Sequence, residues 1–312
     1  MIYRISHLTE YLYSDFVSSS HHLLHLLSRR LPNQSTRWEE LSVEPVPSRR
    51  HDHLDAFGNR TTHLEIHEPH RRLAVLSRCE IDLEPMQSLL PTLAPPWDVI
   101  RDLVRAYTFQ PWLEASEYCF ASPYVPHSAR VAAFAAPSFP PGRPIIEAAI
   151  DLMHRIFAEF TYDSQATNVS TPVEEVLSLR RGVCQDFAHL SLSCFRSLGL
   201  PARYVSGYLV TAVAGQQRLV GADASHAWIQ VYCPDVGWVD FDPTNDVIPT
   251  DKHITVAFGR DFGDVTPLRG VILGGGRHQL NVVVDVAPIE LDDEFPGPGD
   301  RNARPSGTSA LE

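Results

Sequence analysis

The sequence predicts an α+β protein, in which an N-terminal antiparallel β domain precedes a core of helices packed on an antiparallel sheet. Over residues 1–90, β-branched and aromatic residues alternate loosely with polar ones, as in half-buried strands. Between residues 145 and 198, apolar residues recur at the spacing of amphipathic helices. Strand-like segments follow these helices, and helices followed by consecutive strands indicate an α+β fold.

The β domain is predicted over residues 1–90. One strand lies within residues 2–13, IYRISHLTEYLY, and another within residues 73–83. Between them, residues 56–66 (AFGNRTTHLEI) place a Gly-Asn pair between apolar runs. Such a pair favours a tight turn, so we predict a hairpin at this point.

Residues 91–144 are predicted to be a proline-rich connecting segment. Ten prolines interrupt its short apolar pieces, and proline removes a backbone donor that long strands and helices need. We therefore expect short helices and loops that cover the next domain. A free linker is less favourable, because it would expose four aromatic side chains: Trp97, Trp112, Phe120 and Phe134.

The second domain is predicted over residues 145–290. Its expected helices span 145–160, 173–179 and 184–198, and its expected strands span 202–211, 226–233 and 237–244. Residues 250–290 are assigned to the same domain as a C-terminal extension, which ends in a last strand within 280–290. The remaining residues, 291–312, are polar and rich in Pro and Gly, which predicts a disordered tail.

Composition excludes several classes of protein. Hydrophobic residues make up 44% of the chain and charged residues 21%, which is typical of a globular protein. The net charge of −12 argues against a nucleic-acid binder, because phosphate contacts need a basic surface. No segment approaches the roughly 20 apolar residues that span a bilayer, and the N-terminus lacks a signal-peptide pattern. We therefore expect a cytoplasmic protein that contacts neither nucleic acid nor membrane.

One of the five cysteines occupies a position that predicts reactivity. The count is odd and no CxxC pair occurs, which argues against a disulfide framework and a structural zinc site. Cys184 follows Gly182-Val183 and falls in the first turn of a predicted helix. Free backbone N–H groups and the helix dipole stabilise an anion there, which lowers a thiol pKa. Cys194, in the middle of the same helix, is expected to be a packing residue.

A histidine and an aspartate complete a possible catalytic set. His226 opens a predicted strand, and Asp242 ends the next one before a Pro. A single His or an Asp-Pro-Thr segment is usually structural. In the order Cys, His, Asp, however, the three residues fit a nucleophile, a base and an orienting carboxylate. The backbone N–H of Cys184 is the first expected oxyanion donor, and the sequence does not place a second.

Other assignments compete for the same residues. Asp240 shares a strand face with Asp242 and is an alternative orienting residue. Cys, His and Asp are also permissible zinc ligands, if their side chains converge on one point. His189 lies five residues beyond Cys184 on one helix and is expected to point away from it. Trp228 is expected to be a core residue.

Several motifs resemble those of the bacterial transglutaminase-like family, which is part of the papain-like superfamily. They are GVCQDFAHL, LGLPARYVSGYL, ASHAWIQVY and GWVDFDPTN, within about residues 145–250. The upstream ISHLTEYLYSDFV and DAFGN resemble the β domain that accompanies this family, and GRDFGDVTPLRGVILGGGRHQL resembles its C-terminal extension. The resemblance implies a papain-like core with a Cys184–His226–Asp242 triad, and neither cofactor nor metal.

The expected activity is attack of a thiol on an amide carbonyl. Cys184 would form a thioester acyl-enzyme on a peptide or protein substrate, and His226 would protonate the leaving amine. Water as acceptor makes the protein a peptidase or amidase, which is our preferred interpretation. An amine acceptor makes it a protein-glutamine transglutaminase, and a non-catalytic binding scaffold is a further alternative. The sequence identifies neither the substrate nor the oligomeric state.

Overall fold

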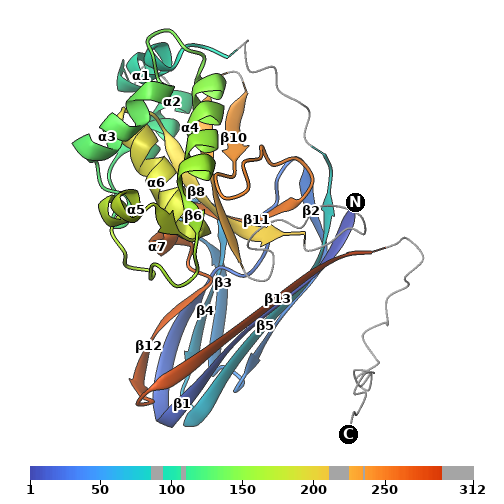
Figure 1. Ribbon diagram of the computed structural model, residues 1–312. Helices are drawn as coiled ribbons and strands as arrows, with labels where there is room; N and C mark the ends of the chain where they lie inside the picture. Colours follow the sequence, from blue (N-terminus) through green and yellow to red (C-terminus); the bar gives the residue numbers. More distant parts are fainter. Residues whose placement is uncertain (86–93, 107–109, 211–224, 235, 290–312) are drawn as a thin grey trace, which may run out of the picture.

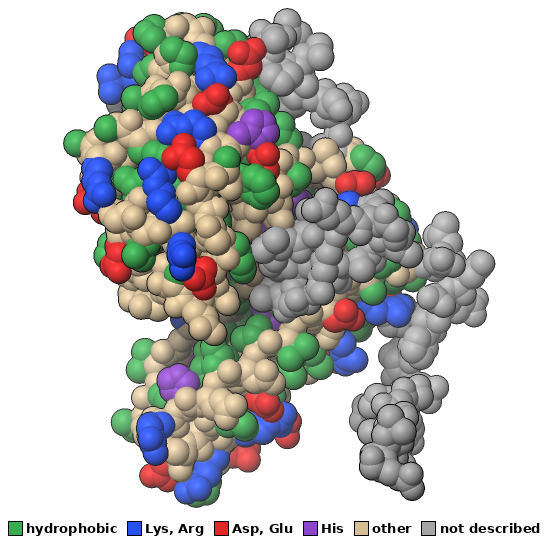
Figure 2. All heavy atoms as spheres, in the orientation of Figure 1, with side chains coloured by type: hydrophobic (Ala, Val, Ile, Leu, Met, Phe, Trp, Pro, Cys, Tyr) green, Lys and Arg blue, Asp and Glu red, His purple; other side chains and the backbone are tan. Residues whose placement is uncertain are grey.

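The computed structural model describes residues 1–85, 94–106, 110–210, 225–234 and 236–289. It has the predicted α+β fold, in which a long curved sheet lies below a compact layer of helices on a second sheet (Figure 1). The predicted tail, 291–312, lies outside the described residues. Arg and Asp/Glu side chains are interspersed over both parts on the face that Figure 2 shows. Within the described part of the chain, no helix is long and apolar enough to cross a membrane.

The first sheet is built around one long strand. Its N-terminal strands are β1 (Ile2–Leu24), β2 (Gln34–Glu44), β3 (Arg49–Leu54), β4 (Arg60–Ile66) and β5 (His70–Leu83). They are antiparallel and lie in the order β2-β5-β1-β4-β3. The predicted hairpin is confirmed as the β3–β4 turn, where Gly58 has a positive φ of 71°.

The C-terminal strands complete this first sheet. Strands β12 (Leu268–Gly274) and β13 (His278–Ile289) both pair with β1, along its second and first halves respectively. The last strand is thus present as predicted, but it belongs to a different sheet from the one expected. The assignment to the second domain therefore needs correction for residues 268–289, because β1 is long enough to pair with four strands, whereas residues 253–259 do join the second sheet.

The connecting segment forms short helices, as predicted. These are α1 (Trp97–Ala106), α2 (Gln110–Ser116), a 3-10 turn at Glu117–Cys119, α3 (Ala129–Ala135) and a 3-10 turn at Ala136–Ser138. Trp97 is buried, and its Nε1 donates to the carbonyl of Pro140 at 2.9 Å. Phe134 is half-buried. Phe120 is 56% exposed, contrary to the expectation, and the side chain of Trp112 lies outside the described part.

The second sheet supports the helices that the sequence predicts. Strands β8 (Ala202–Leu209), β9 (His226–Cys233), β10 (Gly237–Phe241) and β11 (His253–Gly259) are antiparallel in the order β10-β9-β8-β11. Strand β11 was not predicted. On one face lie α4 (Ile145–Glu159), α5 (Val173–Leu179) and α6 (Cys184–Ser197), with short elements β6 (Thr161–Tyr162), β7 (Arg181–Gly182) and α7 (Phe262–Val265) around them (Figure 1).

The two parts share one apolar core. Tyr3 and Ile81 of the first sheet belong to the same buried cluster as Phe187 of α6 and Ile229 of β9. Since apolar side chains pack without a break between the sheets, the N-terminal domain and the second domain form a single packed unit.

Side-chain amides of the first domain also close the free edge of β11. Gln34 donates to the carbonyl of Thr255 and accepts from its N–H, both at 2.8 Å. Asn59 makes the same pair of bonds to Phe258, at 2.6 and 2.8 Å. Each amide therefore satisfies the two backbone groups that a neighbouring strand would otherwise satisfy.

Candidate active site

Cys184 is the first residue of α6, as predicted. The parallel β6–β7 pair delivers the chain to Val183, which has an extended conformation and precedes the helix. The Asp186 carboxylate accepts from the N–H of Val183 at 2.8 Å and from the Thr167 hydroxyl at 2.6 Å, so it closes the first turn. Gly182 is required here, since a Cβ at that position would lie 2.6 Å from the Asp186 carboxylate.

The environment of Cys184 differs from that of the other cysteines. Its thiol is partly exposed at a helix N-terminus, whereas Cys79, Cys194 and Cys233 are buried. Burial raises the pKa of Cys79 to about 11 and that of the half-buried Cys119 to about 12. Burial also raises the pKa of Cys194 far above its ordinary value, in keeping with its predicted packing role. Cys79, Cys119 and Cys194 are therefore poor nucleophiles near neutral pH.

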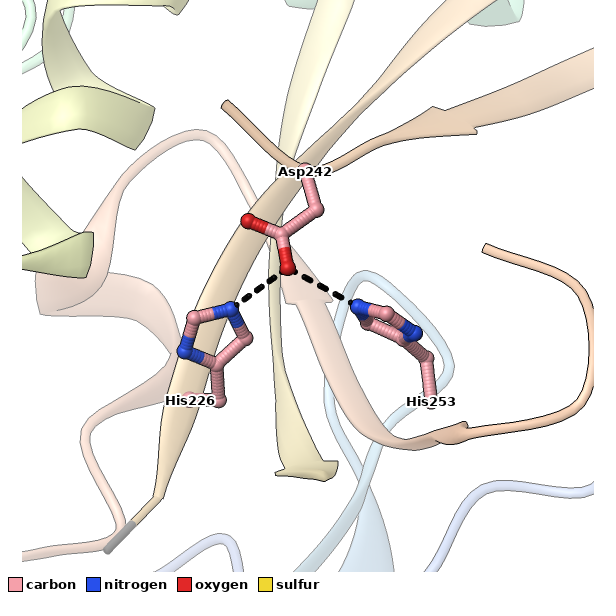
Figure 3. Close-up of side chains that lie close together, drawn as sticks. All are labelled: His226, Asp242 and His253. Atoms are coloured by element: carbon pink, nitrogen blue, oxygen red, sulfur yellow. Dashed lines mark hydrogen bonds and ion pairs between the residues drawn. The ribbon is translucent and has the colours of Figure 1, made fainter. Parts of the chain in front are cut away.

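His226 and Asp242 are hydrogen-bonded in the interior. His226 opens β9, and Asp242 directly follows β10, the neighbouring antiparallel strand. Nε2 of His226 lies 2.9 Å from Oδ2 of Asp242, and both side chains are fully buried (Figure 3). Because neighbouring strands hold both residues, the imidazole has a fixed orientation.

The Cys184 thiol also acts on the His226 imidazole. Nδ1 is the ring nitrogen that does not contact Asp242; it is buried, and apart from the Cys184 sulfur no described residue bonds it. Burial lowers the pKa of His226, but the Asp242 carboxylate and then the Cys184 sulfur raise it more, so that the pKa is about 10. Cys184 and Asp242 thus act on the same imidazole, and the structure brings together all three residues that the sequence singled out.

The turn after β10 fixes the Asp242 carboxylate. Its Oδ1 accepts from the backbone N–H groups of Thr244 and Asn245, at 2.9 and 3.3 Å, and the Asn245 amide donates to Oδ2 at 2.8 Å. Burial would raise the pKa of Asp242, but His226 and His253 lower it far below the ordinary value. The carboxylate is therefore ionised and acts only as an acceptor.

His253 is the residue of this site that sequence reasoning missed. It opens β11, and its Nε2 lies 2.9 Å from the same Oδ2 that His226 contacts (Figure 3). The apolar alternation of residues 253–259 (HITVAFG) could have indicated the strand. No pattern in the sequence indicates that the strand would bring its first side chain to Asp242.

The structure also decides between the competing assignments. Asp240 accepts from Nε1 of Trp228 at 2.6 Å, so it supports the tryptophan rather than orienting His226. Trp228 is buried, as expected, and stacks on His226 with ring centroids 6.1 Å apart. His189 lies away from the thiol and accepts from the N–H of Phe262 at 3.2 Å. Burial lowers the pKa of His189 to about 3, which makes it a neutral core residue.

A metal site fits this arrangement poorly. Donor atoms of His226, Asp242 and His253 all lie within 4.8 Å of one another. However, Nε2 of each imidazole lies 2.9 Å from Oδ2 of Asp242, which is a hydrogen-bond distance, whereas two ligand atoms of a tetrahedral zinc are separated by roughly 3.4 Å. An ion would have to displace both N–H protons and the amide of Asn245. The geometry is that of a hydrogen-bonded set.

Comparison with known proteins decides the family. The family model of the "Transglutaminase-like superfamily" matches residues 133–243, and the model of the "Bacterial transglutaminase-like N-terminal region" matches residues 3–82. An uncharacterized protein of Mycobacterium tuberculosis is 40% identical over 299 residues, which cover 93% of this chain and 94% of that protein. The chain belongs to the bacterial transglutaminase-like family. Its membership confirms the resemblance seen in the sequence and makes it a thiol enzyme of the transglutaminase-like superfamily.

Two further relatives of this transglutaminase-like chain are informative. A protein-glutamine gamma-glutamyltransferase of Pseudomonas aeruginosa is 34% identical over 98 residues, which cover 31% of this chain and 14% of that protein. The crystal structure of a candidate cysteine protease from Cytophaga hutchinsonii superposes with a TM-score of 0.72 at 22% identity, over 95% of this chain and 92% of that one. The second likeness shows that the whole two-part fold is shared.

Proposed function

We propose that this transglutaminase-like protein is a cysteine hydrolase that cleaves amide bonds of peptides or proteins, with Cys184, His226 and Asp242 as its catalytic triad. The observation that carries the proposal is the position of His226. One ring nitrogen bonds the buried Asp242 carboxylate, and the Cys184 sulfur is the only described group that acts on the other. This is the arrangement that a thiolate–imidazolium pair requires.

The proposed reaction has two steps. His226 accepts the Cys184 proton, the thiolate attacks the amide carbonyl, and the C–N bond breaks as His226 returns the proton to the leaving amine. Water then attacks the thioester, gives up a proton to His226 and releases the acid and the thiol. The backbone N–H of Cys184 is placed to stabilise the oxyanion, because first-turn N–H groups have no acceptor within the helix. No organic cofactor or metal takes part.

Transfer to an amine is the second candidate. The named activity of the Pseudomonas aeruginosa relative favours it, since that protein transfers glutamyl groups. Both reactions share the thioester, so the triad does not discriminate between them. Water is present at far higher concentration than any amine, and we therefore place hydrolysis first. A scaffold without activity would have no use for a thiol paired with a buried imidazole.

Alkylation by iodoacetamide tests the triad without a known substrate. We expect Cys184 to react rapidly well below pH 7 in the wild type, and slowly in His226→Ala, when labelling is followed by mass spectrometry. Cys119 is an internal control, because its raised pKa keeps it unreactive at the same pH. Equal labelling in both proteins, appearing only near pH 8.5, would support the scaffold instead.

An assay with casein as substrate shows whether water or an amine attacks the thioester. We expect new amino termini or released ammonia, and little incorporation of a fluorescent primary amine. Incorporation that outruns hydrolysis at millimolar amine would assign the protein to the transglutaminases. Cys184→Ser is the control for both readouts, because it replaces the thiol nucleophile by a hydroxyl of similar size.

A further inference from the structure

The Asp242 carboxylate is hydrogen-bonded to a second imidazole in addition to that of His226. His253 is 8% exposed, and its Nε2 lies 2.9 Å from Oδ2 of Asp242, the distance at which His226 contacts the same atom. The two rings lie on different sides of the oxygen, with centroids 6.1 Å apart (Figure 3). His253 also lies ten residues beyond the region that matches the superfamily core, 133–243.

The ionised Asp242 carboxylate determines which nitrogen of each imidazole carries a proton. Since Asp242 is ionised, it can only accept, so each imidazole donates its Nε2–H. In the neutral rings, Nδ1 then carries the lone pair. For His226 this is the nitrogen available to the Cys184 proton. Nδ1 of His253 has no hydrogen-bond partner among the described residues, and no nucleophile of the proposed reaction faces it.

His253 separates Asp242 from an interdomain pocket. The pocket has a volume of about 560 Å³, and the residues that line it come from both domains, including Gln34, Glu84, Arg203, Trp228 and His253. Asp242 itself is fully buried and does not line the pocket. Water that replaced the His253 ring would therefore reach the carboxylate and weaken its attraction for His226.

The surroundings of His253 come from several elements. Asp242 and Asp240 approach from β10 and its following turn, and His226 from β9. Arg203 of β8 and Glu84 line the same pocket. Trp228 meets the ring edge-on, with centroids 5.1 Å apart. The ring is thus clamped between the tryptophan and the carboxylate, which suits a residue that holds another in place.

We propose that His253 is a positioning residue of the catalytic set, whose Nε2–H and ring hold and shield Oδ2 of Asp242 so that His226 stays directed at Cys184. The proposal rests on the proposed thiol mechanism and adds a fourth member to the triad. His253 touches neither the thiol nor a substrate, and it acts only through Asp242.

Two variants of similar size test the proposal. His253→Gln keeps an N–H donor near the position of Nε2, whereas His253→Leu removes it. We expect the rate of Cys184 alkylation at pH 6 to stay within about threefold of wild type for Gln, and to fall roughly 10- to 100-fold for Leu, since a bond to a charged group is lost. Thermal unfolding and near-ultraviolet circular dichroism report whether each variant folds.

Rescue by a small molecule distinguishes positioning from packing. His253→Ala opens the ring site to the interdomain pocket, so added imidazole can enter and donate to Asp242. We expect imidazole to restore fast labelling, whereas thiazole, a ring of the same size without an N–H, should not. If His253→Leu fails to fold, the Gln variant and the rescue of His253→Ala still decide the question.

Each outcome is informative. Slow labelling in His253→Leu and His253→Ala, together with fast labelling in His253→Gln and in His253→Ala with imidazole, supports the proposal. Labelling of Leu at the wild-type rate overturns it and leaves the thiolate pair intact. Slow labelling in His253→Gln as well, with no recovery of His253→Ala by imidazole, assigns His253 to packing alone and overturns the proposal too. Slow labelling of the wild type itself at pH 6 overturns the thiol mechanism and, with it, this proposal.

Discussion

Replacing Asp242 by Asn should convert Cys184 into an ordinary thiol. The carboxylate accepts five hydrogen bonds, and Asn in its place would offer an amide nitrogen or a neutral oxygen to two imidazole N–H groups. Without the carboxylate, burial lowers the pKa of His226 from about 10 with less to oppose it, so the imidazolium that would pair with the thiolate is disfavoured.

The consequence for reactivity is large at low pH. A thiol with a pKa of about 8.5 is ionised to roughly one part in 300 at pH 6. We therefore expect Asp242→Asn to slow the alkylation of Cys184 at pH 6 by roughly 100-fold or more, and to differ little from wild type at pH 9. The assay is the rate of iodoacetamide labelling of the Cys184 peptide between these pH values.

Asp240→Asn is the matched control for this experiment. Asp240 is also buried, on the same strand, but it accepts from Trp228 and not from His226. It should lose stability without losing the reactivity of the thiol at pH 6. A folded Asp242→Asn protein that labels within threefold of wild type at pH 6 would refute the assignment of Asp242 as the orienting residue.

Three further predictions concern stability and local structure. The raised pKa of His226 contributes stability that is complete below about pH 6.5 and is lost as pH rises through 10, so urea unfolding should show this decline in wild type and not in His226→Gln. Gly182→Ala should destabilise by roughly 1–2 kcal/mol and slow thiol alkylation, because its Cβ would displace the Asp186 carboxylate that closes the first helical turn. Gly207→Ala should cost roughly 3 kcal/mol or more and change tryptophan fluorescence, because its Cβ would lie 2.1 Å from a backbone carbonyl of β11 and 2.5 Å from the Trp228 ring. A free energy of unfolding equal to that of wild type, measured in urea for either glycine variant, would contradict the close contacts at that glycine.

The three residues of the proposed triad could be predicted because each depends on local structure. Gly182 and Val183 end one segment, and a helix that starts at Cys184 follows from the apolar spacing beyond it. His226 and Asp242 lie at neighbouring ends of two consecutive strands, which a short connection makes antiparallel neighbours. Local pattern and chain order were therefore sufficient to bring these three residues together.

Two features depend on strand order and could not be predicted in this way. His253 reaches Asp242 only because β11 pairs with β8 at the edge of the sheet, and the segment alone does not specify that partner. Likewise, the alternation of β13 predicts a strand but not that it joins β1, some 270 residues earlier. Partners of strands are fixed by packing of the whole chain, which the sequence of one segment does not contain.

The N-terminal domain acquires a structural role from this topology. Strand β11 is an edge strand, and its outer backbone groups at Thr255 and Phe258 are satisfied by the amides of Gln34 and Asn59. Without those amides, four buried polar groups would lie unpaired beside the interdomain pocket, each at a cost of roughly 1–3 kcal/mol. Because β11 begins at His253, the domain that closes its edge also holds in place the ring that contacts Asp242. The β domain therefore stabilises the candidate active site indirectly, through the edge of β11.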